Sequence, residues 1–132
     1  RCRRHRSHHE LRHHLGERYR RLLQDTAVDV LTVRPDRDCV WAQFTIFVDQ
    51  RSAIQDALQA QGIPTAVHYP RPLHHQPAYG ALCSPESCPE SVKAATRVLS
   101  LPMSADLSES DQERVVAAIR SIAGVRPRES VA

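Results

Sequence analysis

The chain has 132 residues, of which 41% are hydrophobic and 25% are charged, and its formal net charge is +3. This length predicts one domain that can bury a core, and no apolar run approaches the roughly 18 residues that a membrane-spanning helix needs. The polar, arginine-rich start has no apolar segment of the kind found in secretory signals. We therefore expect a cytoplasmic protein with reduced thiols at its four cysteines, which are Cys2, Cys39, Cys83 and Cys88. The chain does not begin with methionine, which suggests a fragment of a longer protein.

Charge is distributed unevenly along the chain. Residues 1–23 carry eight arginines against two acids, a net of +6, and the remainder has a net of −3. We predict a basic N-terminal arm and linking helix over 1–27, a small domain over 28–124 and a flexible tail over 125–132. Such an arm can bind nucleic acid or an acidic partner. We prefer a solvated helix face and do not expect nucleic acid as a partner.

The first predicted elements are a helix and a short strand. Ser7 and Glu10 have the spacing of a capping box, which predicts a helix over about 8–24. A short strand is predicted from Val28 to Val33, before a turn. The apolar stripe of the helix consists of Leu11, Leu15, Tyr19 and Leu22.

The clearest strand runs from Val40 to Val48, because its residues alternate in character. Asp49 is predicted to cap the following helix, and Gly62 is predicted to end it in a left-handed conformation. The strand residues expected on one face are Val40, Ala42, Phe44, Ile46 and Val48, and the helix residues expected to face the core are Ile54, Ala57 and Leu58.

A further strand is predicted from Ile63 to Tyr69, with Pro64 indicating an edge or an irregular entry. Pro89 suits the first position of a helix, whose inward residues would be Val92, Ala95 and Leu99. Leu101-Pro102 returns the chain to an extended conformation. The last helix is predicted to begin after Ser108, which forms a capping box with Asp111, to bury Val115, Ile119 and Ile122, and to end at Gly124. The order predicts an α+β fold, with a small, mostly antiparallel sheet and helices on one face.

The most informative segment is the proline-rich stretch from His68 to Tyr79. Its prolines exclude a regular helix or a central strand. It nevertheless concentrates imidazole, guanidinium and phenol groups, which recognise polar or anionic small molecules. The side chains that we single out as candidate binding residues are His68, Tyr69, Arg71, His74, His75, Gln76 and Tyr79.

Several alternatives remain open for this segment. Tyr69 can pack under the loop while His68 bonds a backbone carbonyl, and Arg71 can be merely exposed. The histidines and the pair Cys83 and Cys88 could bind zinc, but their spacing matches no common zinc pattern, so we assign no metal site. No motif places a nucleophile against a base, so we assign no catalytic residue.

The phrase from Gly62 through Tyr79, together with Leu99-Ser100-Leu101-Pro102-Met103, resembles the C-terminal small domain of DegT/DnrJ/StrS-type sugar aminotransferases. The likeness runs from about 40 to 124 and is greatest to members that act on UDP-linked 3-keto sugars. Those enzymes use pyridoxal phosphate (PLP) to place an amino group on a keto-sugar nucleotide. The resemblance implies a fold like the C-terminal domain of fold-type I PLP aminotransferases.

The resemblance also implies partners and a site. It implies a sugar-nucleotide substrate, an amino-acid donor and a homodimer, in an enzyme of surface-polysaccharide or amino-sugar biosynthesis. The substrate-binding residues that it implies are His68, Tyr69 and His74, and less strongly Arg71. PLP enzymes hold the cofactor on a lysine, but Lys93, the single lysine, lies outside the motif. We therefore assign no cofactor-binding residue, expect PLP on a missing larger domain, and expect this chain alone to be inactive. The alternative is a stand-alone module in which the basic arm binds nucleic acid or an acidic partner.

Overall fold

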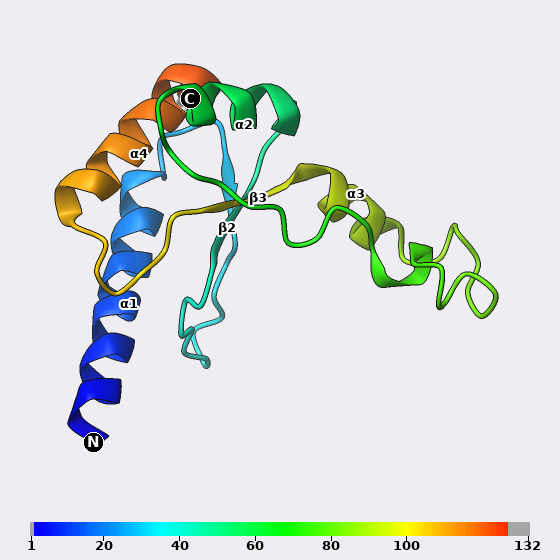
Figure 1. Ribbon diagram of the computed structural model, residues 1–132, viewed down its shortest axis with the longest axis horizontal. Helices are drawn as coiled ribbons and strands as arrows, with labels where there is room; N and C mark the ends of the chain where they lie inside the picture. Colours follow the sequence, from blue (N-terminus) through cyan, green and yellow to red (C-terminus); the bar gives the residue numbers. More distant parts are fainter. Residues whose placement is uncertain (1, 127–132) are drawn as a thin grey trace, which may run out of the picture.

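The computed structural model describes residues 2–126, with side chains from residue 8 onward. Within that range the strands form one antiparallel sheet in the order β1–β2–β3. Helices α1, α2 and α4 lie together on one side of the molecule, and α3 lies apart from them (Figure 1). The predicted α+β class with a small antiparallel sheet is confirmed. In chain order the elements are α1 (Cys2–Leu22), β1 (Asp29–Val30), β2 (Phe44–Phe47), α2 (Arg51–Ala60), the 3-10 helix η1 (Leu73–His75), α3 (Pro89–Arg97), β3 (Val98–Leu101) and α4 (Glu109–Ala123).

Helix α1 begins at Cys2, several residues before the predicted start, so Ser7 lies inside the helix and does not cap it. Residues 2–15 contain neither glycine nor proline, so no backbone feature stops the helix there. The stripe is buried at Leu15 and Tyr19, whereas Leu11 is 47% exposed. The Tyr19 hydroxyl donates to the Pro102 carbonyl oxygen at 3.1 Å, and burial raises the pKa of Tyr19 above its ordinary value.

The strand predicted over 40–48 is regular only in β2, from Phe44 to Phe47. From Phe44 to Val48 the side chains alternate between buried and more exposed positions, as predicted. At Trp41 the predicted order of faces is reversed, and this residue adopts a positive φ of 47°. This conformation directs the indole into the core, so Trp41 is 2% exposed and Val40 is 55% exposed, the opposite of the expected faces. Phe44 lies between the rings of Tyr19 and Trp41, at centroid distances of 4.7 and 5.0 Å.

Strand β1 is also shorter than the predicted segment from Val28 to Val33. Only Asp29 and Val30 pair, opposite Phe47 and Ile46 of β2. Beyond them Leu31 is 45% exposed, so the chain leaves the sheet after two residues.

The predicted N-cap of α2 at Asp49 is wrong. Gln50 occupies that position in a left-handed conformation, and no side chain caps the helix. Asp49 instead accepts a hydrogen bond from Arg97 at 3.0 Å, and Asp29 accepts a second at 3.0 Å. The bond to Asp29 is the main reason that the pKa of Arg97 lies above its ordinary value. At the other end of α2, Gly62 has the expected positive φ of 71°, and the buried residues of the helix are Ile54 and Leu58.

The strand predicted from Ile63 to Tyr69 does not form as a continuous element. A single isolated bridge joins Ala66 to Ser100, on the edge of β3 that β2 leaves open. Pro64 has no backbone N–H to donate to a ladder, which is consistent with pairing limited to one bridge. The segment still follows the edge of the sheet, and it delivers His68 next to β3.

The second half of the chain otherwise follows the predicted order. Pro89 is the first residue of α3, as expected, but the helix ends at Arg97 and Leu99 belongs to β3. Ser108 caps α4 by accepting the Asp111 N–H at 3.1 Å, and Gly124 follows the last turn with a positive φ of 83°. Of the tail predicted over 125–132, Val125 forms an isolated β-bridge with Thr26. Residues 127–132 of this tail lie outside the described residues.

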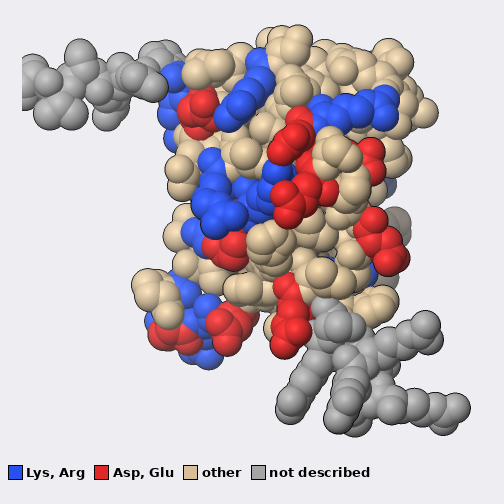
Figure 2. Space-filling model, turned by 90° about the vertical axis from the view of Figure 1, so that its left-hand side faces the viewer, with Lys and Arg blue, Asp and Glu red and all other residues tan. Residues whose placement is uncertain are grey.

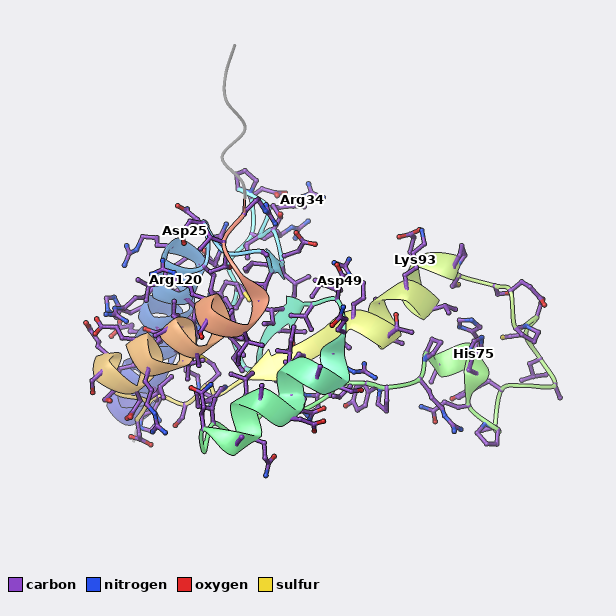
Figure 3. The ribbon with its side chains drawn as sticks, turned by 90° about the horizontal axis from the view of Figure 1, so that it is seen from above. Asp25, Arg34, Asp49, His75, Lys93 and Arg120 are labelled. Carbon is purple, nitrogen blue, oxygen red and sulfur yellow. The ribbon has the colours of Figure 1, made fainter. Side chains whose placement is uncertain are left out.

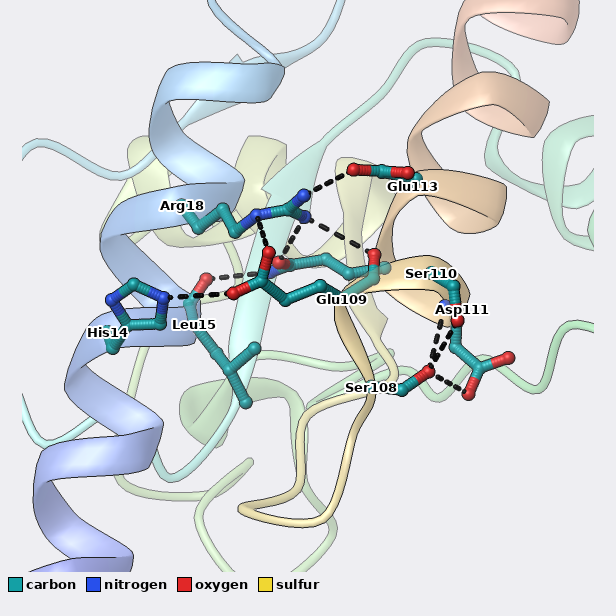
Figure 4. Close-up of polar contacts among 9 residues, drawn as sticks. His14, Leu15, Arg18, Ser108, Glu109, Ser110, Asp111 and Glu113 are labelled. Carbon is teal, nitrogen blue, oxygen red and sulfur yellow. Dashed lines mark hydrogen bonds and ion pairs between the residues drawn. The ribbon is translucent and has the colours of Figure 1, made fainter.

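A polar clamp joins α1 to α4 (Figure 4). Arg18, whose side chain is 12% exposed, donates to Gln112 Oε1 at 2.9 Å and to Glu113 Oε1 at 2.5 Å. It also pairs with Glu109 at 3.4 Å. The amide of Gln112, a fully buried residue, donates to the Leu15 carbonyl oxygen at 2.7 Å. The clamp therefore satisfies a buried amide between α1 and the first turn of α4.

The face that carries α1 and α4 shows basic and acidic side chains beside one another (Figure 2). Arg18 is held by Glu109 and Glu113, and Arg20 pairs with Glu17 at 3.0 Å. The nucleic-acid alternative for the basic arm stays a prediction. In the described residues, no helix is long and apolar enough to cross a membrane.

Candidate functional site

Residues 68–88, here called the proline-rich arm, run away from the sheet and return to it through α3 (Figure 1). Figure 3 shows His75 and Lys93 at the end of the molecule remote from Asp25 and Arg120. The arm contains one short helical turn, η1, which follows Pro72 in extended conformation. Its prolines thus give a projecting segment with little regular structure.

A cavity of about 480 Å³ lies between the arm and α3. Its lining includes all four predicted substrate-binding residues, namely His68, Tyr69, Arg71 and His74. Ser91 of α3 and Val98 of β3 contribute to the opposite wall. One arginine and two histidines line the cavity, and among the described residues no carboxylate does, so its electrostatics favour an anionic or strongly polar ligand.

Two of these side chains lack a hydrogen-bond or ion-pair partner within the described residues. Arg71 is exposed and makes no hydrogen bond or ion pair there. The Nε2 atom of His74 is buried and has no hydrogen-bond partner. An unpaired buried polar atom costs about 1–3 kcal/mol.

The adjacent histidines have different surroundings. Their rings lie 4.4 Å apart, and the His75 Nε2 is 2.7 Å from the Pro85 carbonyl oxygen, so this bond closes the arm on itself. Nearby, the hydroxyl of Ser84 donates to Glu86 and is the main cause of a lowered pKa at that carboxyl. His74 lines the cavity and His75 stabilises the arm.

His68 stands where the arm meets the sheet, and Tyr69 points outward from it. The peptide bond between them is cis, and their rings meet edge to face at a centroid distance of 5.7 Å. Tyr69 is 71% exposed, whereas His68 is half-buried. The alternative that Tyr69 packs under the loop is therefore wrong, and His68 Nδ1 bonds the hydroxyl of Ser100 at 3.2 Å, not a backbone carbonyl.

His68 also borders a second cavity, of about 280 Å³. Gln43, Thr65, Ser100 and Met103 line that cavity, which has no charged side chain. The Thr65 hydroxyl is buried and lacks a partner among the described residues. The sequence pattern did not identify Ser100 and Thr65 as members of the site. A single polar residue inside the apolar run Val98–Leu101 was the available signal for Ser100.

The cysteines of the arm, Cys83 and Cys88, are free thiols that line the larger cavity. Across the described residues, no group of three or more His, Cys, Asp or Glu side chains is arranged to hold a metal ion. Cys88 precedes α3 with a positive φ of 57°, a conformation that few non-glycine residues adopt.

Comparison with known proteins gives a consistent result. The model of the DegT/DnrJ/EryC1/StrS aminotransferase family matches residues 3–120. A dTDP-3-amino-3,4,6-trideoxy-alpha-D-glucose transaminase from Streptomyces venezuelae is 41% identical over 87 residues, which are 65% of this chain and 23% of that protein. A UDP-2-acetamido-2-deoxy-3-oxo-D-glucuronate aminotransferase from Pseudomonas aeruginosa is 36% identical over 109 residues, 83% of this chain and 30% of that protein.

The fold has close counterparts among solved structures. The crystal structure of a DegT DnrJ EryC1 StrS aminotransferase from Brucella abortus matches with a TM-score of 0.82 and 36% identity. The match covers 89% of this chain and 31% of that one. The chain therefore spans roughly a quarter to a third of the length of the proteins that it matches.

Proposed function

Because the chain belongs to the DegT/DnrJ/EryC1/StrS aminotransferase family, we propose that it is the small C-terminal domain of a PLP-dependent aminotransferase. The complete enzyme transfers an amino group from an amino-acid donor to a keto-sugar nucleotide, with a UDP-linked 3-keto sugar as the substrate. One observation carries the proposal. His68, Tyr69, Arg71 and His74 were singled out from sequence, and they line one cavity that has no carboxylate.

The chemistry of these side chains suits a sugar nucleotide. The unpartnered Arg71 guanidinium can form paired hydrogen bonds to a diphosphate, and the imidazoles can donate to its oxygens. The exposed Tyr69 ring offers a surface for stacking a base and a hydroxyl for a hydrogen bond. The proposed division is that Arg71 binds the diphosphate while His68 and Tyr69 contact the remainder of the substrate.

The residues of this chain do not fit the cofactor. The single lysine, Lys93, lies on α3 with its side chain 70% exposed, and it pairs with Glu90 at 2.8 Å. It does not line the cavity that holds the four candidate residues. We therefore place PLP on a larger domain outside this chain and assign no catalytic residue here.

The remaining parts of the proposal come from the family. We propose a homodimer in the cytoplasm, whose product enters surface-polysaccharide or amino-sugar biosynthesis. The chain alone should not transaminate, because it has no lysine placed to hold PLP. A PLP absorbance that survives purification of the chain, together with measured amino transfer, would contradict this expectation.

Calorimetric titration of the 132-residue chain with UDP-N-acetylglucosamine and with dTDP-glucose tests the substrate class. We expect UDP-N-acetylglucosamine to bind more tightly, and Arg71→Gln to weaken its binding about tenfold, the effect of one charge-assisted hydrogen bond. Arg34→Gln is the matched control, because within the described residues Arg34 forms its ion pair with the nearby Asp36 alone, on an exposed loop. Tighter binding of dTDP-glucose would overturn the UDP assignment, and failure of both ligands to bind would overturn the sugar-nucleotide site.

A further inference from the structure

Two hydroxyl groups connect the sheet to the imidazole of His68. Thr45 of β2 lies directly opposite Ser100 of β3, and their hydroxyl oxygens are 3.0 Å apart. The Ser100 hydroxyl is in turn 3.2 Å from His68 Nδ1. Ser100 is only 5% exposed, so this hydroxyl bonds side chains of the protein in a place where bulk water hardly reaches.

The backbone of Ser100 anchors the same segment. Its N–H donates to the Ala66 carbonyl oxygen at 2.7 Å, and its carbonyl oxygen accepts the Ala66 N–H at 3.1 Å. Three hydrogen bonds from one residue of β3 thus fix the stretch from Ala66 to His68. The ring of His68 is consequently held by a packed strand, although it lies at the start of the projecting arm.

The hydroxyls of Thr45 and Ser100 and the His68 ring, here called the hydroxyl chain, can donate their protons in either of two directions. Each hydroxyl has one proton, and within the described residues Thr45 Oγ1 bonds only Ser100. If Thr45 donates to Ser100 and Ser100 donates to His68 Nδ1, both hydroxyl protons are bonded. In the opposite direction His68 Nδ1–H donates to Ser100 and Ser100 donates to Thr45, which leaves the Thr45 proton without an acceptor among the described residues. Both directions make two hydrogen bonds, and they differ in what is left over. In either direction His68 Nε2 borders the two cavities, where a ligand or water can bond it, but only the second direction also leaves the Thr45 proton unbonded among the described residues. The first direction is therefore favoured.

We propose that Ser100 and Thr45 are positioning residues that hold neutral His68 as the tautomer with its proton on Nε2. That nitrogen has no bond within the described residues, and the ring borders both the 480 Å³ and the 280 Å³ cavity. The Nε2–H group is therefore a fixed donor at the junction of the two cavities, suited to a phosphate or carbonyl oxygen. The binding role of this donor rests on the proposed function, whereas the tautomer depends on the hydroxyl chain alone.

Long-range ¹H–¹⁵N correlation spectra of the histidine rings in the 132-residue chain, recorded at about pH 8, test the tautomer. We expect His68 to be predominantly Nε2-protonated in the wild type, and Ser100→Ala to give a mixture of tautomers. Ser100→Thr retains the hydroxyl and should retain the wild-type pattern. Ser52→Ala removes an exposed hydroxyl on α2 and should change nothing. A predominantly Nδ1-protonated wild type, or an unchanged tautomer in Ser100→Ala, would overturn the proposal.

Titration of the same variants with UDP-N-acetylglucosamine tests the consequence for binding. Ser100→Ala should weaken binding about fivefold, the value of one ordinary hydrogen bond, and Thr45→Val should weaken it about twofold because Ser100 still reaches His68. If His68 is Nε2-protonated but the protein binds no sugar nucleotide, the substrate role is refuted and the proposed tautomer still holds. Equal affinities of wild type and Ser100→Ala would refute the positioning role even where the sugar nucleotide binds. Backbone spectra of Ser100→Ala and Ser100→Thr identify any loss of fold.

Discussion

Around Phe44 the side chains are enclosed on every side, whereas along residues 68–88 the large apolar side chains face solvent. Phe44 is fully buried between Tyr19 and Trp41, but Tyr69, Leu73 and Leu82 are 71%, 64% and 78% exposed. The candidate binding residues lie on the second region and not on the first. We propose that the packed part carries the stability and that the arm carries recognition, with His68 and Ser100 where the two regions meet.

The largest expected difference between the two regions follows from truncating one apolar side chain in each. Phe44→Ala should lower the free energy of unfolding by about 3–5 kcal/mol, because it removes a fully buried ring and leaves a cavity. Leu82→Ala in the arm should change it by less than about 0.5 kcal/mol. Urea denaturation followed by circular dichroism measures both. Comparable losses would show that the arm is packed as tightly as the core.

Adding a methyl group gives a smaller contrast. Gly16 of α1 lies against the Trp41 ring, so a Cβ at this position would overlap the indole. Gly16→Ala should cost about 1–3 kcal/mol through overpacking, even though alanine favours a helix. Gly80→Ala in the arm meets no atom closer than 3.9 Å and should be tolerated. Thermal unfolding of the two variants compares them, and a stabilised Gly16→Ala protein would contradict the packing of Trp41.

The polar clamp can be tested against an exposed ion pair. Arg18→Gln should lower the free energy of unfolding by about 1–2 kcal/mol, because the buried Oε1 of Gln112 loses its donor. Arg34→Gln, which breaks an exposed pair with Asp36, should cost less than about 0.5 kcal/mol. Chemical denaturation at low salt measures both variants. Equal effects would mean that the clamp adds no more than a surface pair.

The smallest effect is confined to alkaline pH. Burial raises the pKa of Tyr19, so in the folded state the hydroxyl stays neutral when it would ionise in the unfolded chain. Its contribution to stability is present below about pH 10, the pKa of an unperturbed tyrosine, and is lost above it by up to about 1.4 kcal/mol per pH unit. Tyr19→Phe should reduce the slope of stability against pH between 9.5 and 11, and Tyr69→Phe should not. Equal slopes in wild type and Tyr19→Phe would contradict the burial of an un-ionised hydroxyl.

The sequence predicted the elements with strong periodicity and clear caps. Ser108 and Gly124 bound α4 as expected, and Pro89 begins α3. Sequence reasoning failed where tertiary contacts outweigh local pattern. The positive φ of Trp41 reverses an alternation that looked regular, and Arg97 binds the Asp49 carboxylate that had been assigned to a helix cap.

The candidate site was predicted in part for the same reason. The density of ring and guanidinium groups identified His68, Tyr69, Arg71 and His74 in one segment, and the fold places them on one cavity. The hydroxyls of Thr45 and Ser100 come from two strands that meet only through antiparallel pairing. Ser100 contacts His68 across 32 positions of the sequence and Thr45 across 55, and local spacing does not reveal such contacts.

Chemical-shift mapping of the isotopically labelled chain with UDP-N-acetylglucosamine tests the central claim, that the arm is the recognition region, most directly. The account predicts saturable shifts at His68, Tyr69, Arg71 and His74, with unchanged signals at Phe44 and along α4. Shifts confined to the arginines of α1, or no saturable shift on the arm, would contradict it.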